Sequence, residues 1–414
     1  MAQTQYSHTF DNGLVLLAER MDWLESAAFA VLIPSGYSHD PDDHLGLSNF
    51  LCEMLQRGCG DRTSRQFVED LDRLGVDRSV SLSANHASFG GATLASNICD
   101  TLSIYGDLIL RPHLPAEQLE DARMVCYQEL LATEDDLAAK AIQALRERHY
   151  GQPWGRSAQG DEAGLQRTTI EDIRNQYQQT FRPDGAIISV AGKIEWNSLL
   201  DHVSSLFADW DNTPVPHVNE SPPLGGYSHI PYDSSQTQIA IAYDSVPYRH
   251  EDYFKARGAV GVLSDGMSSR LFTRIREELG LCYTVYASSH SLRDRGSVIA
   301  YSGTSTERAQ ETLDELINEL RRIGDGIEEA ELTRLKARVK STLIMQQESS
   351  ASRAGSIAGD WYHLGRIRAL DEIGSIIDGL TCETVNTYLD ENRPQRFTVV
   401  TLGEKELEVP IDVS

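Results

Sequence analysis

The amino-acid sequence predicts an α+β fold of two homologous domains, each a mainly antiparallel sheet with helices packed on one face. Its 414 residues are long for one domain and sufficient for two. Predicted strands are followed by predicted helices in blocks, which is typical of α+β proteins. The third observation is an internal repeat at a constant offset of 211 residues, in which Tyr177, Arg182, Pro183 and Gly192 recur as Tyr388, Arg393, Pro394 and Gly403.

The repeated segment has the same predicted structure in both halves. A helix ends before each Arg-Pro pair, because proline disfavours helical backbone in the residue before it. A buried strand follows and is closed by glycine. Four prolines and a Gly pair between residues 211 and 226 are typical of a linker. We therefore predict an N-terminal domain over residues 1–212, a linker over 213–226 and a C-terminal domain over 227–414.

The remaining elements follow from hydrophobic periodicity. Short apolar runs predict strands, and apolar residues three and four positions apart predict helices. The predicted strands are residues 14–18, 27–33, 238–243 and 281–288, and the predicted helices are residues 45–57, 117–133, 268–279, 307–323 and 328–347.

Composition argues against several classes of function. The formal net charge is −25 and the acidic residues are spread along the chain, so nucleic acid is not an expected partner. The apolar run at residues 27–33 is too short to cross a membrane, and the polar residues 1–12 predict no secretory signal. Six scattered cysteines without a C-x-x-C pair predict free thiols in a reducing compartment, and hence a cytoplasmic protein.

One segment near the N-terminus resembles a zinc-binding helix. Asn12-Gly13, Pro34-Ser35-Gly36 and the run from Gly46 to Met54 resemble the signature of the pitrilysin/insulinase-like zinc metallopeptidase family, in its short two-domain bacterial type. In active members the helix carries H-x-x-E-H: two histidines on one helix face bind zinc, and the glutamate activates the metal-bound water. Here Asn49 and Glu53 stand at the histidine positions and Cys52 stands at the glutamate position.

The resemblance implies a third zinc ligand, a glutamate, at Glu129. The three oxygen donors of Asn49, Glu53 and Glu129 could hold calcium or magnesium weakly, but they make a poor tetrahedral zinc site. Cys52 cannot replace a carboxylate base, and as a nucleophile it would need a histidine that the sequence does not show nearby. We therefore expect no metal and no cofactor in this chain, and interpret Asn49 and Glu53 as polar remnants of a former site.

The second half keeps the other part of the family's site. The stretch from Gly266 to Tyr286 resembles the segment in which active members carry an arginine and a tyrosine seven residues apart, here Arg276 and Tyr283. Arginine is a fixed cationic donor for a peptide carbonyl or carboxylate, and tyrosine can hydrogen-bond a developing oxyanion. Taken singly, Arg276 would be a solvated helix charge and Tyr283 a sheet residue; the continuous match favours the functional interpretation.

A further stretch resembles the family strand that pairs with an extended substrate through backbone hydrogen bonds, which places Ala84, Asn85, His86 and Ala87 at the substrate. The family also implies two similar domains joined into a clam-shell. In some bacterial relatives one subunit keeps H-x-x-E-H and a second keeps the Arg/Tyr pair, and together they form one peptidase.

We therefore expect a non-catalytic subunit that contributes Arg276 and Tyr283 to peptide substrates at the zinc site of a homologous partner, as a heterodimer or as a homodimer. Two alternatives stay open. One is a peptide- or protein-binding scaffold with no role in hydrolysis. The other is a metalloendopeptidase with an altered metal site.

Overall fold

The computed structural model describes residues 4–410, and these residues form two compact units. Unit 1 takes the chain up to Ala132 together with residues 156–219 and 344–369, and unit 2 takes residues 133–155, 220–343 and the chain from Leu370 onward. The chain passes from unit 1 to unit 2 between Asn219 and Glu220, which is inside the predicted linker. Neither unit is a continuous half of the sequence, because each includes a short segment from the other half.

Unit 1 contains a six-stranded sheet in the order β1-β2-β8-β3-β7-β6. Only β2 and β8 pair in parallel; the other neighbours are antiparallel. The strands are β1 (Thr4–Thr9), β2 (Val15–Arg20), β3 (Ser26–Ile33), β6 (Asp77–Leu82), β7 (Ala87–Leu94) and β8 (Ile187–Gly192), beside a small pair β4 (Gly58–Cys59) and β5 (Arg62–Thr63). The helices are α1 (Leu47–Leu55), α2 (Ser64–Arg73), α3 (Ile98–Leu110), most of α4 (Leu119–Asp135), α6 (Glu162–Arg167), α7 (Ile170–Thr180), α8 (Trp196–Phe207) and α12 (Ser350–Leu364).

Unit 2 contains a five-stranded sheet in the order β11-β12-β10-β13-β9. Here β13 and β9 are the parallel pair. The strands are β9 (Tyr227–Pro231), β10 (Gln236–Ser245), β11 (Cys282–Ser291), β12 (Gly296–Ser305) and β13 (Thr398–Gly403). The helices are α5 (Leu137–Tyr150), α9 (Tyr253–Ser264), α10 (Ala309–Arg322), most of α11 (Glu329–Gln346), α13 (Leu370–Gly379) and α14 (Cys382–Glu391). Two sheets with these helices confirm the predicted α+β class.

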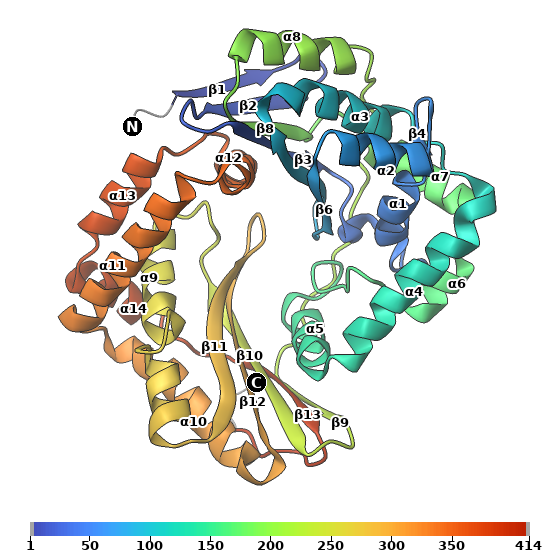
Figure 1. Cartoon of the computed structure of the whole chain (residues 1–414). Coiled ribbons are helices and arrows are strands. Elements are labelled where there is room, and N and C mark those ends of the chain that lie inside the picture. The colour runs from blue at the N-terminus through green and yellow to red at the C-terminus, as the bar shows by residue number, and fades with distance from the viewer. Residues whose placement is uncertain (1–3, 411–414) are drawn as a thin grey trace. The chain divides into compact units, whose positions relative to one another are not determined.

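Most helices of each unit cover one face of its sheet, and a single helix covers the other face. In β10 the alternation of a strand sends Ile239 and Ile241 into a large cluster with α9, α10 and α14, while Ala240 and Ala242 face α5. In unit 1 the corresponding single helix is α12, which packs on β2, β3 and β8 (Figure 1). The inner strands β2, β8, β10 and β13 are therefore buried on both faces, which explains their nearly continuous apolar sequences, whereas the edge strands β1, β6 and β11 are polar and largely exposed.

The two units are built on the same plan. The order β2-β8-β3-β7-β6 in unit 1 matches β9-β13-β10-β12-β11 in unit 2, strand for strand and direction for direction. Strand β13 begins and ends 211 residues after β8, the offset of the sequence repeat. Helix α12 stands at a similar offset from α5, beginning 213 residues after it. Each of these two helices therefore packs on the sheet of the unit formed mainly by the other half of the sequence.

Two predicted elements differ in the structure. The helix predicted over residues 268–279 contains a π-helical stretch, Phe272–Glu278. The residues predicted as a substrate strand, Ala84 to Ala87, are mainly a turn: β6 ends at Leu82 and β7 begins at Ala87. Small polar residues there favour a tight reversal, which Ser83 closes by donating its N–H to the carbonyl of His86 at 2.8 Å.

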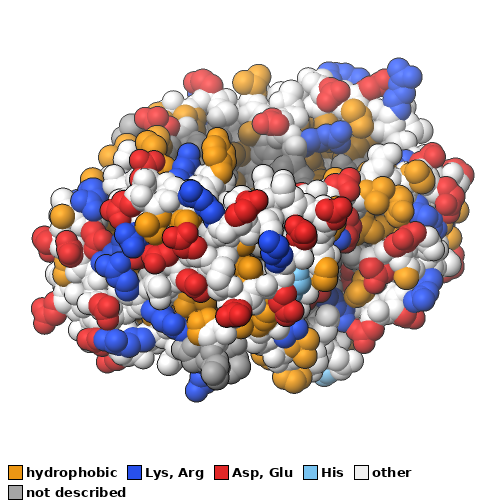
Figure 2. Space-filling view, turned by 90° about the horizontal axis from the view of Figure 1, so that it is seen from below, with side chains coloured by type: hydrophobic (Ala, Val, Ile, Leu, Met, Phe, Trp, Pro, Cys, Tyr) orange, Lys and Arg blue, Asp and Glu red, His pale blue; other side chains and the backbone are white. Residues whose placement is uncertain are grey.

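Charged side chains of both signs share the face of the molecule seen in Figure 2. On the face shown in Figure 2, acidic side chains lie among basic, apolar and neutral ones. Between residues 4 and 410 no helix has the length and apolar content needed to cross a bilayer.

Candidate functional site

Helix α1 is held by a buried carboxylate at its N-terminus. Asp40 accepts hydrogen bonds from the backbone N–H groups of Gly46 and Ser48, both at 2.9 Å, and from the Ser48 hydroxyl at 2.5 Å. Burial raises the pKa of Asp40 to about 6, although these hydrogen bonds oppose the shift. Gly46 has φ +92°, and a Cβ there would lie 2.6 Å from the Gln159 carbonyl. This local geometry fixes the direction of the helix that carries Asn49, Cys52 and Glu53.

The structure brings Asn49 and Glu129 together. The Asn49 amide donates to the Glu129 carboxylate at 2.9 Å, so α1 and α4 meet here as the resemblance implies. Glu53 instead pairs with Arg57 one turn later on α1, at 2.6 Å, with about a quarter of the Glu53 side chain exposed. The carboxylates of Glu53 and Glu129 are therefore both engaged by side chains of this chain.

Cys52 is buried in the core of unit 1. Its side chain is 4% exposed, and burial raises the pKa of its thiol to about 12, with the carboxylates of Asp40, Glu129 and Glu53 adding to the shift. Cys126 of α4 is buried in the same cluster, and burial raises its pKa as well. At neutral pH such thiols stay protonated, so Cys52 acts as a small apolar residue and not as a nucleophile.

These residues do not fit a zinc ion. Zinc prefers nitrogen and sulfur ligands in tetrahedral geometry. Asn49, Glu53 and Glu129 supply an amide and two carboxylates that already have partners, and the nearby thiol is protonated. No cluster of three or more His, Cys, Asp or Glu side chains able to hold a metal occurs within residues 4–410.

Arg276 and Tyr283 form a stack in unit 2. The Arg276 guanidinium lies 4.7 Å from the ring centroid of Phe272 and 5.1 Å from that of Tyr283, so it makes cation–π contacts with both rings. The π-helical stretch carries both Phe272 and Arg276, and such stretches are frequent at functional sites. Tyr283 is 82% exposed, so its hydroxyl is open to solvent within this unit.

A β-bulge sets the position of Tyr283. In the ladder, Cys282 faces Thr304 and Thr284 faces Gly303, which leaves Tyr283 as the extra residue. Bulges are common beside active sites because they redirect a side chain. Before the bulge, Gly280 adopts φ +59°, and its carbonyl accepts a hydrogen bond from Arg308 at 2.5 Å. Strand β11 is also an edge of its sheet.

The turn at residues 83–86 lies against the loop that precedes α1. The carbonyls of Ser83 and Ala84 accept hydrogen bonds from the N–H groups of Tyr37 and Ser38, at 3.1 and 3.0 Å. Gly36 permits this approach, because a Cβ there would lie 2.2 Å from the Ala84 carbonyl oxygen. His86 is buried with its ring edge-on to Tyr362, at 4.4 Å between centroids. The turn is therefore an internal support, and the edge strand beside it is β6.

Two family models match the sequence. The model described as insulinase (peptidase family M16) matches residues 16–162, and the one described as peptidase M16 inactive domain matches residues 167–339. The chain belongs to the pitrilysin/insulinase-like family. Helix α1 lies in the first matched region, and Arg276 and Tyr283 lie in the second.

Relatives of similar length support this membership. An uncharacterised zinc protease of Rickettsia felis is 25% identical over 96% of this chain and 97% of its own length. The uncharacterised zinc protease YmxG of Bacillus subtilis is 27% identical over 92% of this chain and 93% of its own length. A crystal structure described as a peptidase M16 inactive domain from Pseudomonas fluorescens shares the fold with a TM-score of 0.90 at 18% identity, covering 98% of this chain and 100% of that one. The crystal structure of a protease from Helicobacter pylori also shares the fold, with a TM-score of 0.89 at 19% identity, covering 97% of this chain and 100% of that one.

Sequence reasoning missed three residues of this family member that shape the two sites. Asp40 accepts hydrogen bonds from the N-terminus of α1 although it stands six residues before Gly46, and capping signals in sequence mark the N-cap residue itself, so none identified Asp40. Arg57 stands four residues after Glu53, the spacing of a helical ion pair, and this signal was available. Phe272 stands four residues before Arg276 in the predicted helix, so the same spacing signalled their contact as well.

Proposed function

We propose that this chain is the non-catalytic subunit of a two-subunit peptidase of its family. In this proposal Arg276 and Tyr283 contact a peptide at the zinc site of a homologous partner that carries H-x-x-E-H. One contrast carries the proposal: the Arg276/Tyr283 stack is assembled and exposed, whereas the donors at Asn49, Cys52 and Glu53 do not suit zinc.

The chemistry of the stack suits peptide bonds. Phe272 and Tyr283 restrict the Arg276 side chain, so less entropy is lost when its N–H groups donate to a peptide carbonyl or carboxylate. The Tyr283 hydroxyl would donate a hydrogen bond to a substrate oxygen that gains negative charge, and the zinc of the partner would supply the activation of water. An extended peptide could add to the edge of β6, where backbone groups are available for strand addition.

The test is a peptide-cleavage assay on this chain mixed with its H-x-x-E-H homologue. We expect this chain alone to contain less than one zinc per chain and to cleave no peptide. We expect cleavage when the two chains are mixed. Arg276→Ala and Tyr283→Phe should each lower kcat of the mixture by about 100-fold, the effect of removing one oxyanion donor. Unchanged rates in both variants would contradict the proposal.

Arg274→Ala is the matched control. Arg274 lies two residues from Arg276 on the same π-helical stretch, but its guanidinium pairs with Glu278 at 3.1 Å and Glu315 at 3.2 Å. The Arg274→Ala substitution removes the same charge as Arg276→Ala. It should leave kcat of the mixture within about twofold of the unchanged value, since exposed ion pairs contribute little to stability. Size-exclusion chromatography of each mixture separates loss of assembly from loss of catalysis.

A scaffold without a hydrolytic role gives the opposite result. It predicts peptide binding by this chain alone and no effect of the chain on the homologue's rate. A metalloendopeptidase with an altered site predicts bound metal and cleavage without any partner. We expect the assembly in a reducing compartment such as the cytoplasm, because all six cysteines are free.

A further inference from the structure

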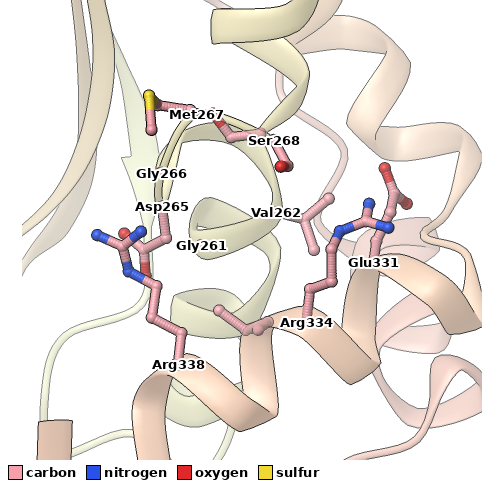
Figure 3. A pocket seen from close by; sticks show the side chains of 11 residues that line it. Gly261, Val262, Asp265, Gly266, Met267, Ser268, Glu331, Arg334 and Arg338 are labelled. Atoms are coloured by element: carbon pink, nitrogen blue, oxygen red, sulfur yellow. The ribbon is translucent and has the colours of Figure 1, made fainter. Parts of the chain in front are cut away.

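The segment that contains the π-helical stretch is anchored to α11 at its start. Arg270 donates hydrogen bonds to both carboxylate oxygens of Glu331, each at 2.7 Å. The loop before Arg270, residues 265–268, borders a pocket of about 210 Å³ against α11 (Figure 3). Figure 3 shows the guanidiniums of Arg334 and Arg338 pointing to opposite ends of this pocket, so they do not converge on one ligand. This contact is therefore a support for the start of the segment.

The end of the segment is held by side chains, because the ladder is interrupted there. Tyr283 is the extra residue of the bulge between β11 and β12, so the backbone beside it does not follow the regular ladder. Three backbone carbonyls around Tyr283 accept hydrogen bonds from side chains of β12 and of the turn that follows it. The pairs are Arg308 with the Gly280 carbonyl at 2.5 Å, Thr304 with that of Leu281 at 2.6 Å, and Ser302 with that of Thr284 at 3.1 Å.

Thr304 fixes the backbone two residues before Tyr283. Thr304 is 4% exposed and Leu281 is 3% exposed, so little water can reach this hydrogen bond and replace it. On its other side, Thr304 Oγ1 lies 3.1 Å from the buried hydroxyl of Thr312 on α10. The N–H of Leu281 donates to the Ile275 carbonyl at 2.9 Å. The peptide groups of Leu281 therefore join the π-helical stretch to β11, and the Thr304 hydroxyl holds this junction.

We propose that Thr304 is a positioning residue for Tyr283. The proposal rests on the proposed function, in which the Tyr283 hydroxyl contacts the peptide. The Thr304 hydroxyl fixes a peptide group where β11 leaves the regular ladder, and this sets the direction in which the extra side chain leaves the strand. Because Tyr283 is 82% exposed, the backbone beneath it, rather than packing in the core, decides where its hydroxyl lies.

The test compares two variants in the mixture with the H-x-x-E-H homologue. Thr304→Val removes the hydroxyl and keeps the branched shape, whereas Thr304→Ser keeps the hydroxyl. We expect Thr304→Val to lower kcat by about tenfold and to change KM by less than about twofold, since a displacement of about 1 Å can cost up to about 100-fold in rate. Thr304→Ser should restore most of kcat. Thr304→Cys, whose thiol is a weak donor, should give an intermediate loss and supplies the measurement if Thr304→Val does not fold.

A double-variant cycle separates positioning from a general loss of structure. In a Tyr283→Phe background, Thr304→Val should change kcat by less than about twofold, because the hydroxyl that Thr304 positions is absent. A structural effect that does not act through Tyr283 would lower kcat by the same factor in both backgrounds.

Thr401→Val is the matched control. Thr401 is a fully buried residue of β13 in the same sheet, separated from β11 by β12 and β10, and its hydroxyl bonds to Tyr227 and His229, both at 2.9 Å. This change should leave kcat within about twofold. Hydrogen exchange of residues 279–286 in this chain alone gives a readout without the partner. It should be about fivefold faster in Thr304→Val, which lacks one hydrogen bond, and unchanged in Thr401→Val.

The outcomes distinguish this proposal from the proposed function. If Tyr283→Phe leaves kcat unchanged, the proposed function fails and the role of Thr304 fails with it. If Tyr283→Phe lowers kcat but Thr304→Val does not, only the role of Thr304 is refuted. Equal losses of kcat in Thr304→Val and Thr401→Val, additive losses in the double variant, or no rescue by Thr304→Ser would also refute it.

Discussion

The attachment of α12 to the unit 1 sheet depends on a buried ion pair. Arg353 of α12 donates to Glu19 of β2 through Nε at 2.8 Å and through Nη2 at 2.6 Å. The two side chains are 1% and 0% exposed, and Gln5 adds a third hydrogen bond to Glu19 at 3.0 Å. Arg353→Met therefore leaves a buried carboxylate without its countercharge.

Breaking such a pair from one side costs about 3–5 kcal/mol, whereas replacing both members with apolar residues is often close to neutral. We expect Arg353→Met to destabilise unit 1 by about 4 kcal/mol, and the double variant Glu19→Leu/Arg353→Met to recover most of that loss. A unit of this size would lose roughly 10 °C in melting temperature. The exposed pair of Glu25 and Lys193, at 2.8 Å, is the control. Glu25→Gln should cost less than about 1 kcal/mol.

Urea unfolding at pH 7 measures these values, and hydrogen exchange of the α12 amides shows whether the helix detaches first. Exchange should accelerate in Arg353→Met at α12 before it does at β3 or β8. The reasoning is refuted if Arg353→Met costs no more than Glu25→Gln, or if the effects of Glu19→Leu and Arg353→Met simply add in the double variant.

Three further predictions concern α1 and the residues around it. Because the pKa of Asp40 is raised from 3.8 to about 6, its protonated form favours folding; that stability is present below pH 4 and is lost as pH rises through 6. Asp40→Asn removes this titration. Between pH 3 and pH 7 the free energy of unfolding of the unchanged chain should therefore fall by about 3 kcal/mol relative to that of the variant. If the two free energies change in parallel with pH, the prediction is wrong. Cys52 should resist thiol reagents at pH 8 in the native protein and react after unfolding, as mass spectrometry of labelled peptides can show; rapid native labelling would mean that the thiol is not buried. The triple variant Asn49→His, Cys52→Glu, Glu53→His should bind one zinc per chain, with Glu129 as the third ligand. Competition with a chelator measures the zinc affinity. A zinc affinity no higher than that of the unchanged chain would show that α1 and α4 are not placed as described.

Much of the fold followed from local pattern. The strand at residues 398–403 was predicted from its repeat of residues 187–192, because an apolar run after Arg-Pro and before glycine leaves few other structures. Helices α1, α4, α10 and α11 agree with their predicted ranges to within a few residues. The turn at residues 83–86 was wrongly predicted as strand, since its resemblance to a substrate strand outweighed the Ser and Asn residues that favour a reversal.

The sequence by itself determined the duplication, the family, and the prediction that Asn49, Cys52 and Glu53 stand at the H-x-x-E-H positions, because these depend only on which residues stand at which spacing. Only the tertiary structure decided which sheet α5 and α12 cover, since an amphipathic face specifies burial but not the surface that buries it. It also decided that Glu53 pairs with Arg57, that Asn49 meets Glu129, and that the Cys52 thiol is buried and protonated. The contact of Asn49 with Glu129 joins segments 80 residues apart, and the burial of Cys52 depends on how the core packs, so no local spacing encodes either. The pair of Glu53 and Arg57 differs, because its four-residue spacing is a local signal.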